Sequence, residues 1–338
     1  MAYCLHIILR VRVGMNTLKI TKYIPLICLA VLFLRVCPVF AEDDGNETID
    51  PIQAAESEIL AGINLARSDP WAEAERLGLD PEVLRAEVVP EETAAQWDRG
   101  LWPLVSNPVL NEVARAHCAD MVARDYFSSE TPEGQGAEEL VSAAGYPVQL
   151  LREDLAALGF EVFLDPQEAA ETLIDALLVD ALMQRFQDGE PTLLHAGVVE
   201  AGIALWGGEL SIDNKSHQVY IICILLARPR VPESAWFQCG YVYQDLNGNY
   251  AYDPGEGLEE IEPSYCYDNE QSLKLATGPQ GVYCLQRPMY KWWLEICDNV
   301  WLDLWCPEVP EPHDTVVRHD YMLSPFFYMD LRARCEWY

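Results

Sequence analysis

The stretch NPVLNEVARAHCADMVARDYFSS, from Asn107 to Ser129, decides the fold of the first half of the chain. Asn107 is a favoured helix cap, and Pro108 suits the first helical position, where a missing N–H group costs nothing. The residues that follow form a stripe at helical spacing, made of Leu110, Val113, Ala114, His117, Cys118, Met121 and Val122. A helix with one such face must pack against a sheet or another helix. The sequence therefore predicts a layered domain around this helix.

Further helices are predicted on both sides of this stretch. Four more Asp-Pro pairs mark helix starts, at Asp50-Pro51, Asp69-Pro70, Asp80-Pro81 and Asp165-Pro166. Residues 138–144 are predicted as a short helix. The acidic residues 87–100 are predicted as a connecting loop.

The hydrophobic pattern changes in the second half of the chain. The apolar runs 199–206 and 219–226 predict buried strands. Beyond the stiff segment 228–232, short alternating runs separated by Gly, Pro and Asn turns predict a small β-sandwich. The expected fold class is α+β, with a first domain over 51–229, a linker over 230–236 and a β-domain over 237–338.

The N-terminus is predicted to be a signal peptide over residues 1–41, followed by an acidic leader over 42–50. Lys19 and Lys22 precede an apolar run, and Val39-Phe40-Ala41 offers a small-residue cleavage site. Met15 is a second candidate for the true start. The apolar run is too short for a membrane span. We therefore expect a secreted, extracellular or periplasmic protein with no membrane span after signal removal.

The charge balance limits the possible partners. The formal net charge is −32, and it falls to −37 once residues 1–41 are removed, because this segment contains basic residues and no acidic ones. Such a surface repels nucleic acids and anionic membranes and attracts cations. We therefore expect no nucleic-acid partner.

The cysteine count favours disulfides. Removal of the signal segment leaves eight of the eleven cysteines: Cys118, Cys223, Cys239, Cys266, Cys284, Cys297, Cys306 and Cys335. An even number in a secreted chain is typical of a disulfide framework, and six of the eight lie in the predicted β-domain. Cys118 and Cys223 lie on apolar faces of the first domain, where they form either a pair or two buried thiols.

A calcium site is predicted in a twelve-residue loop that starts at Asp245. Oxygen donors fall at positions 1, 3, 5, 7, 9 and 12, supplied by Asp245, Asn247, Asn249, the Ala251 carbonyl, Asp253 and Glu256. This is the spacing of an EF-hand-type loop, closed by a bidentate glutamate. Tyr250 stands at position 6, where the helical EF-hand has glycine, and no helices flank the loop. The alternative is a metal-free turn rich in Asn, Asp and Gly.

Several segments together resemble the CAP superfamily in its bacterial, secreted, SCP-like form. They are the opening helix, INLARSDPWAEAERLGLD (63–80), AGYP (144–147), REDLA (152–156), EAGIALWGG (200–208) and VYIICILLARP (219–229). The resemblance runs from about residue 51 to residue 229. It implies a three-layer α-β-α sandwich with a surface cleft.

In that family the cleft usually carries two histidines and two acids that can hold a divalent metal. The resemblance puts the first histidine position at Ser129 and the second near Gly189, so both imidazoles are lost. It puts the first acid at Glu153, while Asp180 is a candidate for the second. Without the two imidazoles we expect no transition metal in the cleft.

Two other histidines are possible substitutes in the cleft. His117 lies on the apolar stripe and is expected to be a buried core histidine, whereas His195 lies nearer the cleft rim and is a candidate cleft residue. Ser129 with Glu153 lacks a nearby base, which argues against a nucleophilic serine. The cleft candidates are therefore Glu153, His195 and Ser129.

The calcium loop and its surroundings resemble the SdrD B-like repeats of bacterial adhesins. The strand segment 240–243 precedes the loop, and 276–278 with 281–283 fits the later strand of such a module. The resemblance implies a β-module stabilised by Ca²⁺. Taken together, we expect a non-enzymatic binding protein for an unknown extracellular protein, lipid or glycan. The alternative is a CAP-type hydrolase or metal-dependent enzyme that uses Glu153 and His195.

Overall fold

The computed structural model describes most of the first domain and parts of the second. The described residues are 6–9, 50–161, 164–183, 191–212, 215–231, 235–249, 252–259, 264–267, 271–274, 277–288, 293–297, 300–303, 316–318 and 320–323. The helices are α1 (Pro51–Ser68), α2 (Pro70–Arg76), α3 (Pro81–Glu87), α4 (Glu91–Trp97), α5 (Pro108–Ala123), α6 (Ala137–Ala143) and α7 (Pro166–Met183). The strands of the first domain are β1 (His6–Leu9), β2 (Val105–Ser106), β3 (Val148–Phe160), β4 (Glu200–Ile212) and β5 (Lys215–Pro229).

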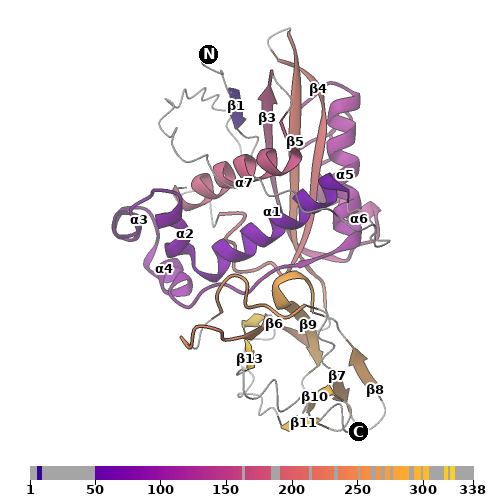
Figure 1. Ribbon diagram of the computed structural model, residues 1–338. Coiled ribbons are helices and arrows are strands. Elements are labelled where there is room, and N and C mark those ends of the chain that lie inside the picture. The colour runs from indigo at the N-terminus through magenta and orange to yellow at the C-terminus, as the bar shows by residue number, and fades with distance from the viewer. Residues whose placement is uncertain are drawn as a thin grey trace, which may run out of the picture.

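These five strands form one sheet in the order β1-β3-β5-β4-β2. Figure 1 shows β1, β3, β5 and β4 in this arrangement. β4 and β5 form an antiparallel hairpin in which Ile212 pairs with Lys215 next to the turn. β3 pairs antiparallel with the other edge of β5. The short β2 runs parallel to the start of β4. β5 therefore lies at the centre of the sheet.

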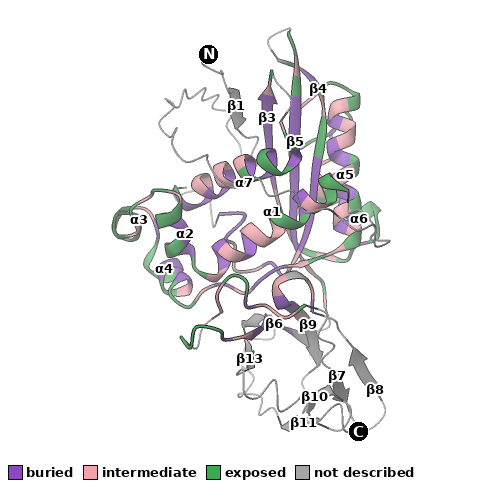
Figure 2. Ribbon diagram, in the orientation of Figure 1, coloured by how far each residue is buried: buried purple, intermediate pink, exposed green. Residues whose placement is uncertain are grey.

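Helices cover both faces of this sheet, and the side chains of β5 alternate between the two. Ile222 and Ile224 belong to the core that includes residues of α1 and α7. Ile221 and Cys223 belong to a second core with residues of α5 and α6. A strand buried on both faces needs apolar residues at every position, which explains the continuous run in the sequence. The domain is thus a three-layer α-β-α sandwich, with its sheet largely buried (Figure 2).

Helix α5 begins where the sequence predicts it, directly after Asn107. The side chain of Asn107 accepts hydrogen bonds from the N–H groups of Val109 and Leu110, at 3.0 and 3.2 Å. A disulfide between Cys118 and Cys223 fixes α5 to β5. Of the two alternatives for these cysteines, the pair is confirmed.

Three elements differ from the sequence-based expectation. Residues 87–100 are not simply a loop, because they contain α4, which buries Trp97 to 1% exposure. β3 was not predicted as a strand, and it starts before Arg152. Within the expected signal peptide, the structure describes only His6–Leu9, which pair antiparallel with β3. The rest of that segment lies outside the described residues.

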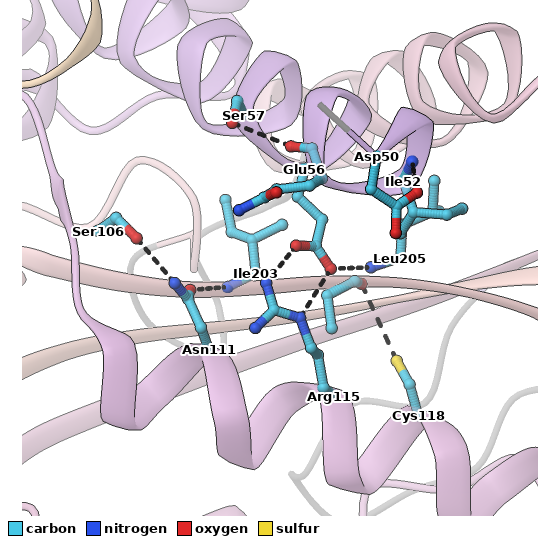
Figure 3. Close-up of polar contacts among 12 residues, drawn as sticks. Asp50, Ile52, Glu56, Ser57, Ser106, Asn111, Arg115, Cys118, Ile203 and Leu205 are labelled. Atoms are coloured by element: carbon cyan, nitrogen blue, oxygen red, sulfur yellow. Dashed lines mark hydrogen bonds and ion pairs between the residues drawn. The ribbon is translucent and has the colours of Figure 1, made fainter. Parts of the chain in front are cut away.

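Helix side chains protect the outer edge of β4 beyond the short β2 (Figure 3). The Oδ1 atom of Asn111 on α5 accepts from the N–H of Ile203 at 2.9 Å. The carboxylate of Glu56 on α1 accepts from the N–H of Leu205 at 3.2 Å and from Arg115 of α5 at 2.5 Å. An edge strand with unpaired N–H groups invites pairing with another chain, and here both helix layers supply the acceptors.

The C-terminal part is built from short strands. They are β6 (Ala235–Gln244), β7 (Ser264–Tyr267), β8 (Gln271–Lys274), β9 (Val282–Pro288), β10 (Trp293–Cys297), β11 (Val300–Asp303), β12 (Val316–Arg318) and β13 (Tyr321–Leu323). β6 pairs antiparallel with β9 and parallel with both β12 and β13, while β11-β10-β7-β8 forms a second sheet. A disulfide joins the facing residues Cys239 and Cys284. The fold class is therefore α+β, with a three-layer domain followed by a disulfide-containing β-region.

Candidate functional site

The predicted cleft acid, Glu153, is buried against the opening helix. Its Oε1 atom lies 3.3 Å from Nδ1 of His117, and the two side chains are 8% and 3% exposed. Neither carboxylate oxygen of Glu153 nor Nε2 of His117 has a hydrogen-bond partner among the described residues. The contact is therefore an ion pair if the ring is protonated, enclosed between β3 and α5.

Ser129, at the predicted first histidine position, is also buried, with 5% exposure. Within the described residues its hydroxyl forms no hydrogen bond with Glu153, His117 or His195, so it has no base to activate it. Asp180 lies on α7, in the layer that packs on the other face of the sheet from Glu153. Gly189 lies outside the described residues.

His195 lies on that other face. Its Nε2 atom is 3.5 Å from Nη2 of Arg152, and Arg152 precedes Glu153 in β3, where successive side chains point to opposite faces. The carbonyl of His195 accepts from Nη1 of Arg67 on α1 at 3.0 Å. The structure thus does not bring Glu153 and His195 together, because the sheet separates them.

The surroundings of His195 favour its neutral form. Burial first, and then the positive charges of Arg152, Arg67 and Arg228, lower the pKa of His195 to about 4. The N–H of Gly197 donates to Nδ1 of the ring at 2.8 Å. An imidazole held neutral among three cations is poorly suited to act as a general acid near neutral pH.

The polar partner of Glu153 was missed at the level of sequence. His117 was assigned to the core stripe of α5, and it is indeed buried, at 4% exposure. The available signal was the alternation of β3: Leu155 and Ala157, two and four residues beyond Glu153, pack in the core of α5. Glu153 shares their side of the strand, so its side chain points toward the stripe that carries His117.

The predicted calcium loop forms a network of short polar contacts. The Glu256 carboxylate accepts from the N–H groups of Leu246 and Asp253, at 2.8 and 3.0 Å. The side-chain amides of Asn247 and Asn249 donate to Oδ2 of Asp253, at 2.7 and 2.6 Å. These contacts gather the predicted ligands around Asp253.

The loop also buries carboxylates. Asp245 and Glu256 are only 6% and 5% exposed. Asp245 accepts from the N–H of Gly248 at 2.7 Å. Buried carboxylate, amide and carbonyl oxygens are the donor set that Ca²⁺ prefers, so the chemistry of these side chains fits the ion. To coordinate through oxygen, the amides of Asn247 and Asn249 would have to turn over, because both now present nitrogen to Asp253.

Acidic and histidine side chains alone do not form a metal cluster in the part of the chain that is described. No group of three or more His, Cys, Asp or Glu residues there is arranged to hold an ion. The predicted loop depends in addition on two asparagines and on the carbonyl of Ala251, which lies outside the described residues. The calcium site therefore stays a prediction.

The loop is connected to the first domain through tyrosines. Tyr252, inside the loop, stacks on Tyr241 of β6 with ring centroids 3.9 Å apart. The hydroxyl of Tyr241, a fully buried residue, donates to the carbonyl of Asn64 on α1 at 3.1 Å. Val105 of β2 packs in the same apolar cluster. A change in the loop can therefore reach the junction between the two domains.

Comparison with known proteins gives only distant likenesses. No protein-family model and no curated protein matches the chain. An outer surface protein from Borrelia burgdorferi is 14% identical, with 54% of this chain and 97% of that chain covered and a TM-score of 0.32. An extracellular protein containing an SCP domain from Bacillus anthracis str. Ames is 16% identical, with 55% and 45% covered and a TM-score of 0.29.

The disulfides Cys118–Cys223 and Cys239–Cys284 indicate an oxidising environment. Across the described residues, no helix is both long and apolar enough to cross a membrane.

Proposed function

We propose that the chain is a secreted binding protein without enzymatic activity, in which a CAP-like domain is joined to an SdrD B-like module stabilised by Ca²⁺. The observation that carries the proposal is the enclosure of Glu153, which is 8% exposed and in contact with His117. An acid that meets only another buried side chain cannot reach a substrate in this conformation. Its partner would be an extracellular protein, lipid or glycan, recognised by the surface of the two domains.

The calcium loop would serve stability and domain arrangement. Asp245, Asn247, Asn249, Asp253 and Glu256, with the carbonyl of Ala251, would hold the ion. Ca²⁺ would neutralise the buried carboxylates and fix the loop that carries Tyr252. Tyr252 stacks on Tyr241, and the Tyr241 hydroxyl donates a hydrogen bond to α1. The ion would therefore also stiffen the junction between the domains.

Thermal unfolding with the disulfides intact tests the calcium part of the proposal. For an extracellular calcium module with a dissociation constant of about 0.1–1 mM, 10 mM Ca²⁺ should add roughly 1.4–2.7 kcal/mol of stability over a chelator. Mg²⁺ at the same concentration controls for screening of the strongly acidic surface.

Matched variants localise the effect. Asp253→Asn should abolish the response to Ca²⁺, whereas Glu92→Gln, which removes one exposed charge elsewhere, should retain it. A melting temperature that responds equally to Ca²⁺ and Mg²⁺, or that is unchanged by chelator, would rule out the calcium site.

Metal analysis distinguishes the binding protein from the enzyme alternative. About one calcium ion per chain and no other metal supports the proposal. A transition metal that is retained by the purified protein and lost in His195→Gln would instead support a metal-dependent enzyme. The separation of Glu153 from His195 by the sheet argues against that alternative.

A further inference from the structure

The two edges of the five-stranded sheet are covered in different ways. At the β4 edge, the side chains of Asn111 and Glu56 accept hydrogen bonds from backbone N–H groups. At the β3 edge, the backbone of residues 156–159 is covered by a strand, because β1 (His6–Leu9) pairs antiparallel with it (Figure 1). In the described part of the chain, no other strand and no side chain forms a hydrogen bond to that edge of residues 156–159. This part of the β3 edge therefore depends on β1 for its pairing.

The β3 tract over residues 155–160 lacks the features that keep an edge strand from pairing. Proteins discourage edge pairing with charged side chains, prolines or β-bulges. Residues 155–160 read LAALGF and contain no charge and no proline, in a chain with a formal net charge of −32. The register irregularity between β3 and β5 lies at Val148 and Leu150, outside this tract. Residues 156–159 are therefore suited to accept a neighbouring strand.

Both faces of this tract are apolar. Ala156 and Leu158 pack in the core that includes α7, whereas Leu155 and Ala157 pack in the core that includes α6. A strand added beside them continues a sheet that is covered by helices on both faces, and strands of such sheets are apolar at successive positions. The sequence HIIL of β1 follows this rule, with isoleucine at two successive positions. The expected occupant of the edge is thus a continuously apolar, β-branched strand.

The segment that contains β1 is absent from the secreted chain that the sequence predicts. Cleavage after Ala41 removes His6–Leu9, and a start at Met15 excludes these residues as well. In an antiparallel pair, every second residue directs both its N–H and its C=O toward the same neighbouring strand. Removal of β1 therefore leaves the outward-facing N–H and C=O groups of residues 156–159 without a strand partner, which makes them a template for pairing. This step rests on the proposed function, because secretion removes the segment.

We propose that residues 156–159 of β3, in the secreted chain, bind an extended apolar segment of a partner protein as an additional antiparallel strand. The type of occupant is given by β1, which pairs with the same edge in the uncleaved chain through the sequence HIIL. Main-chain hydrogen bonds supply the affinity in this mode of recognition, and contacts of the side chains supply the specificity. The acidic surface of the chain repels acidic segments, so the bound segment is neutral or basic. The partner is therefore a polypeptide that is recognised through its backbone.

The test uses the protein as the cell exports it. The full chain is expressed in a secreting host, and the first residue of the exported protein is identified by mass spectrometry. The probe is a fluorescent peptide of residues 5–13, LHIILRVRV, titrated by anisotropy in 0.15 M sodium chloride. At this salt concentration the Debye length of about 8 Å limits non-specific attraction between the basic peptide and the acidic protein. Saturable binding supports the proposal. An exported protein that retains His6–Leu9, or one that does not bind the peptide, overturns it.

Two controls separate strand pairing from charge attraction. The peptide with Ile7→Pro and Ile8→Pro keeps its charge but lacks the N–H donor at two successive positions, one of which faces β3 in any register. It should bind at least about tenfold more weakly, because a facing carbonyl is left unpaired. The uncleaved chain of 338 residues, with its disulfides formed, should bind the original peptide equally weakly, because β1 occupies the edge. Undiminished affinity in either control contradicts the proposal.

Amide hydrogen exchange localises the bound peptide without any variant. The peptide should slow exchange in residues 156–159 and leave the β4 segment 203–205 unchanged, because Asn111 and Glu56 already bond N–H groups there. Protection elsewhere overturns the proposal. So does a dimer in sedimentation velocity whose β3 edge is protected before peptide is added, because the occupant is then a second copy of the chain. These outcomes are independent of the response to Ca²⁺, which tests the proposed function separately.

Discussion

Replacement of Glu56 by alanine is expected to destabilise the first domain by about 3 kcal/mol, because its carboxylate binds both the edge of the sheet and helix α5. Glu56 extends from α1 to the edge of β4, where it accepts from the N–H of Leu205, and it also meets Arg115 from α5 (Figure 3). Its side chain is 8% exposed, whereas that of Arg115 is 42% exposed.

The expected loss of stability in Glu56→Ala has two parts. Loss of the acceptor leaves the buried N–H of Leu205 unpaired, which costs about 2 kcal/mol. Loss of the ion pair costs about 1 kcal/mol, at the upper end of the range for exposed pairs, because water can solvate the half-exposed Arg115. Glu56→Gln keeps an acceptor for Leu205 and loses only the charge, so it should cost about 1 kcal/mol.

The assay is urea unfolding at neutral pH, followed by the fluorescence of tryptophans such as the buried Trp97. Glu58→Ala makes the same deletion on the exposed face of α1 and should stay within about 0.5 kcal/mol of the wild type. If Glu56→Ala and Glu58→Ala unfold at the same urea concentration, the edge of β4 does not depend on Glu56. The reasoning would then be refuted.

Two further outcomes are expected from the first domain. The double variant Cys118→Ala/Cys223→Ala should lose about 3–5 kcal/mol in urea unfolding, because the bridge closes a loop of 105 residues; a loss below about 1 kcal/mol would contradict this. The pKa of His195 is about 4 in the folded state, below the unfolded value of about 6.5, so the unfolded state takes up a proton first as the pH falls. The stability that His195 contributes is therefore present above about pH 6.5 and is lost as the pH falls toward 4. In chloride buffer His195→Gln should lose less stability than the wild type over that interval, and identical pH profiles would contradict the shift.

Most of the first domain could be predicted because its signals are local. Asn107 and Asp50 cap their helices through their own side chains, and a stripe at helical spacing requires no knowledge of distant residues. β3 was missed because Arg152, Glu153 and Asp154 interrupt its apolar pattern. Arg152 and Glu153 are accommodated by residues far away in sequence, and such partners leave no local signal.

The polar sites illustrate the same limit. The resemblance to the CAP superfamily pointed to Glu153 as a cleft candidate, and the enzyme alternative combined it with His195, which approaches Arg152 instead. The side chains of Arg152 and Glu153 point to opposite faces of the sheet. To assign a histidine partner to each of them, one must know on which face of the sheet each histidine lies. The spacing of the predicted calcium loop is local, so that prediction required no knowledge of the fold. The packing of Tyr252 against Tyr241 could not.

The sheet therefore separates two polar clusters of opposite character. On the face of α5, the acid Glu153 is enclosed with His117. On the face of α1, Arg67 and Arg152 surround a histidine whose low pKa keeps it neutral. A hydrolytic centre needs an acid and a base within reach of one substrate atom, and a tightly packed sheet between Glu153 and His195 prevents this. Glu153 and His195 therefore do not form one hydrolytic centre in this arrangement.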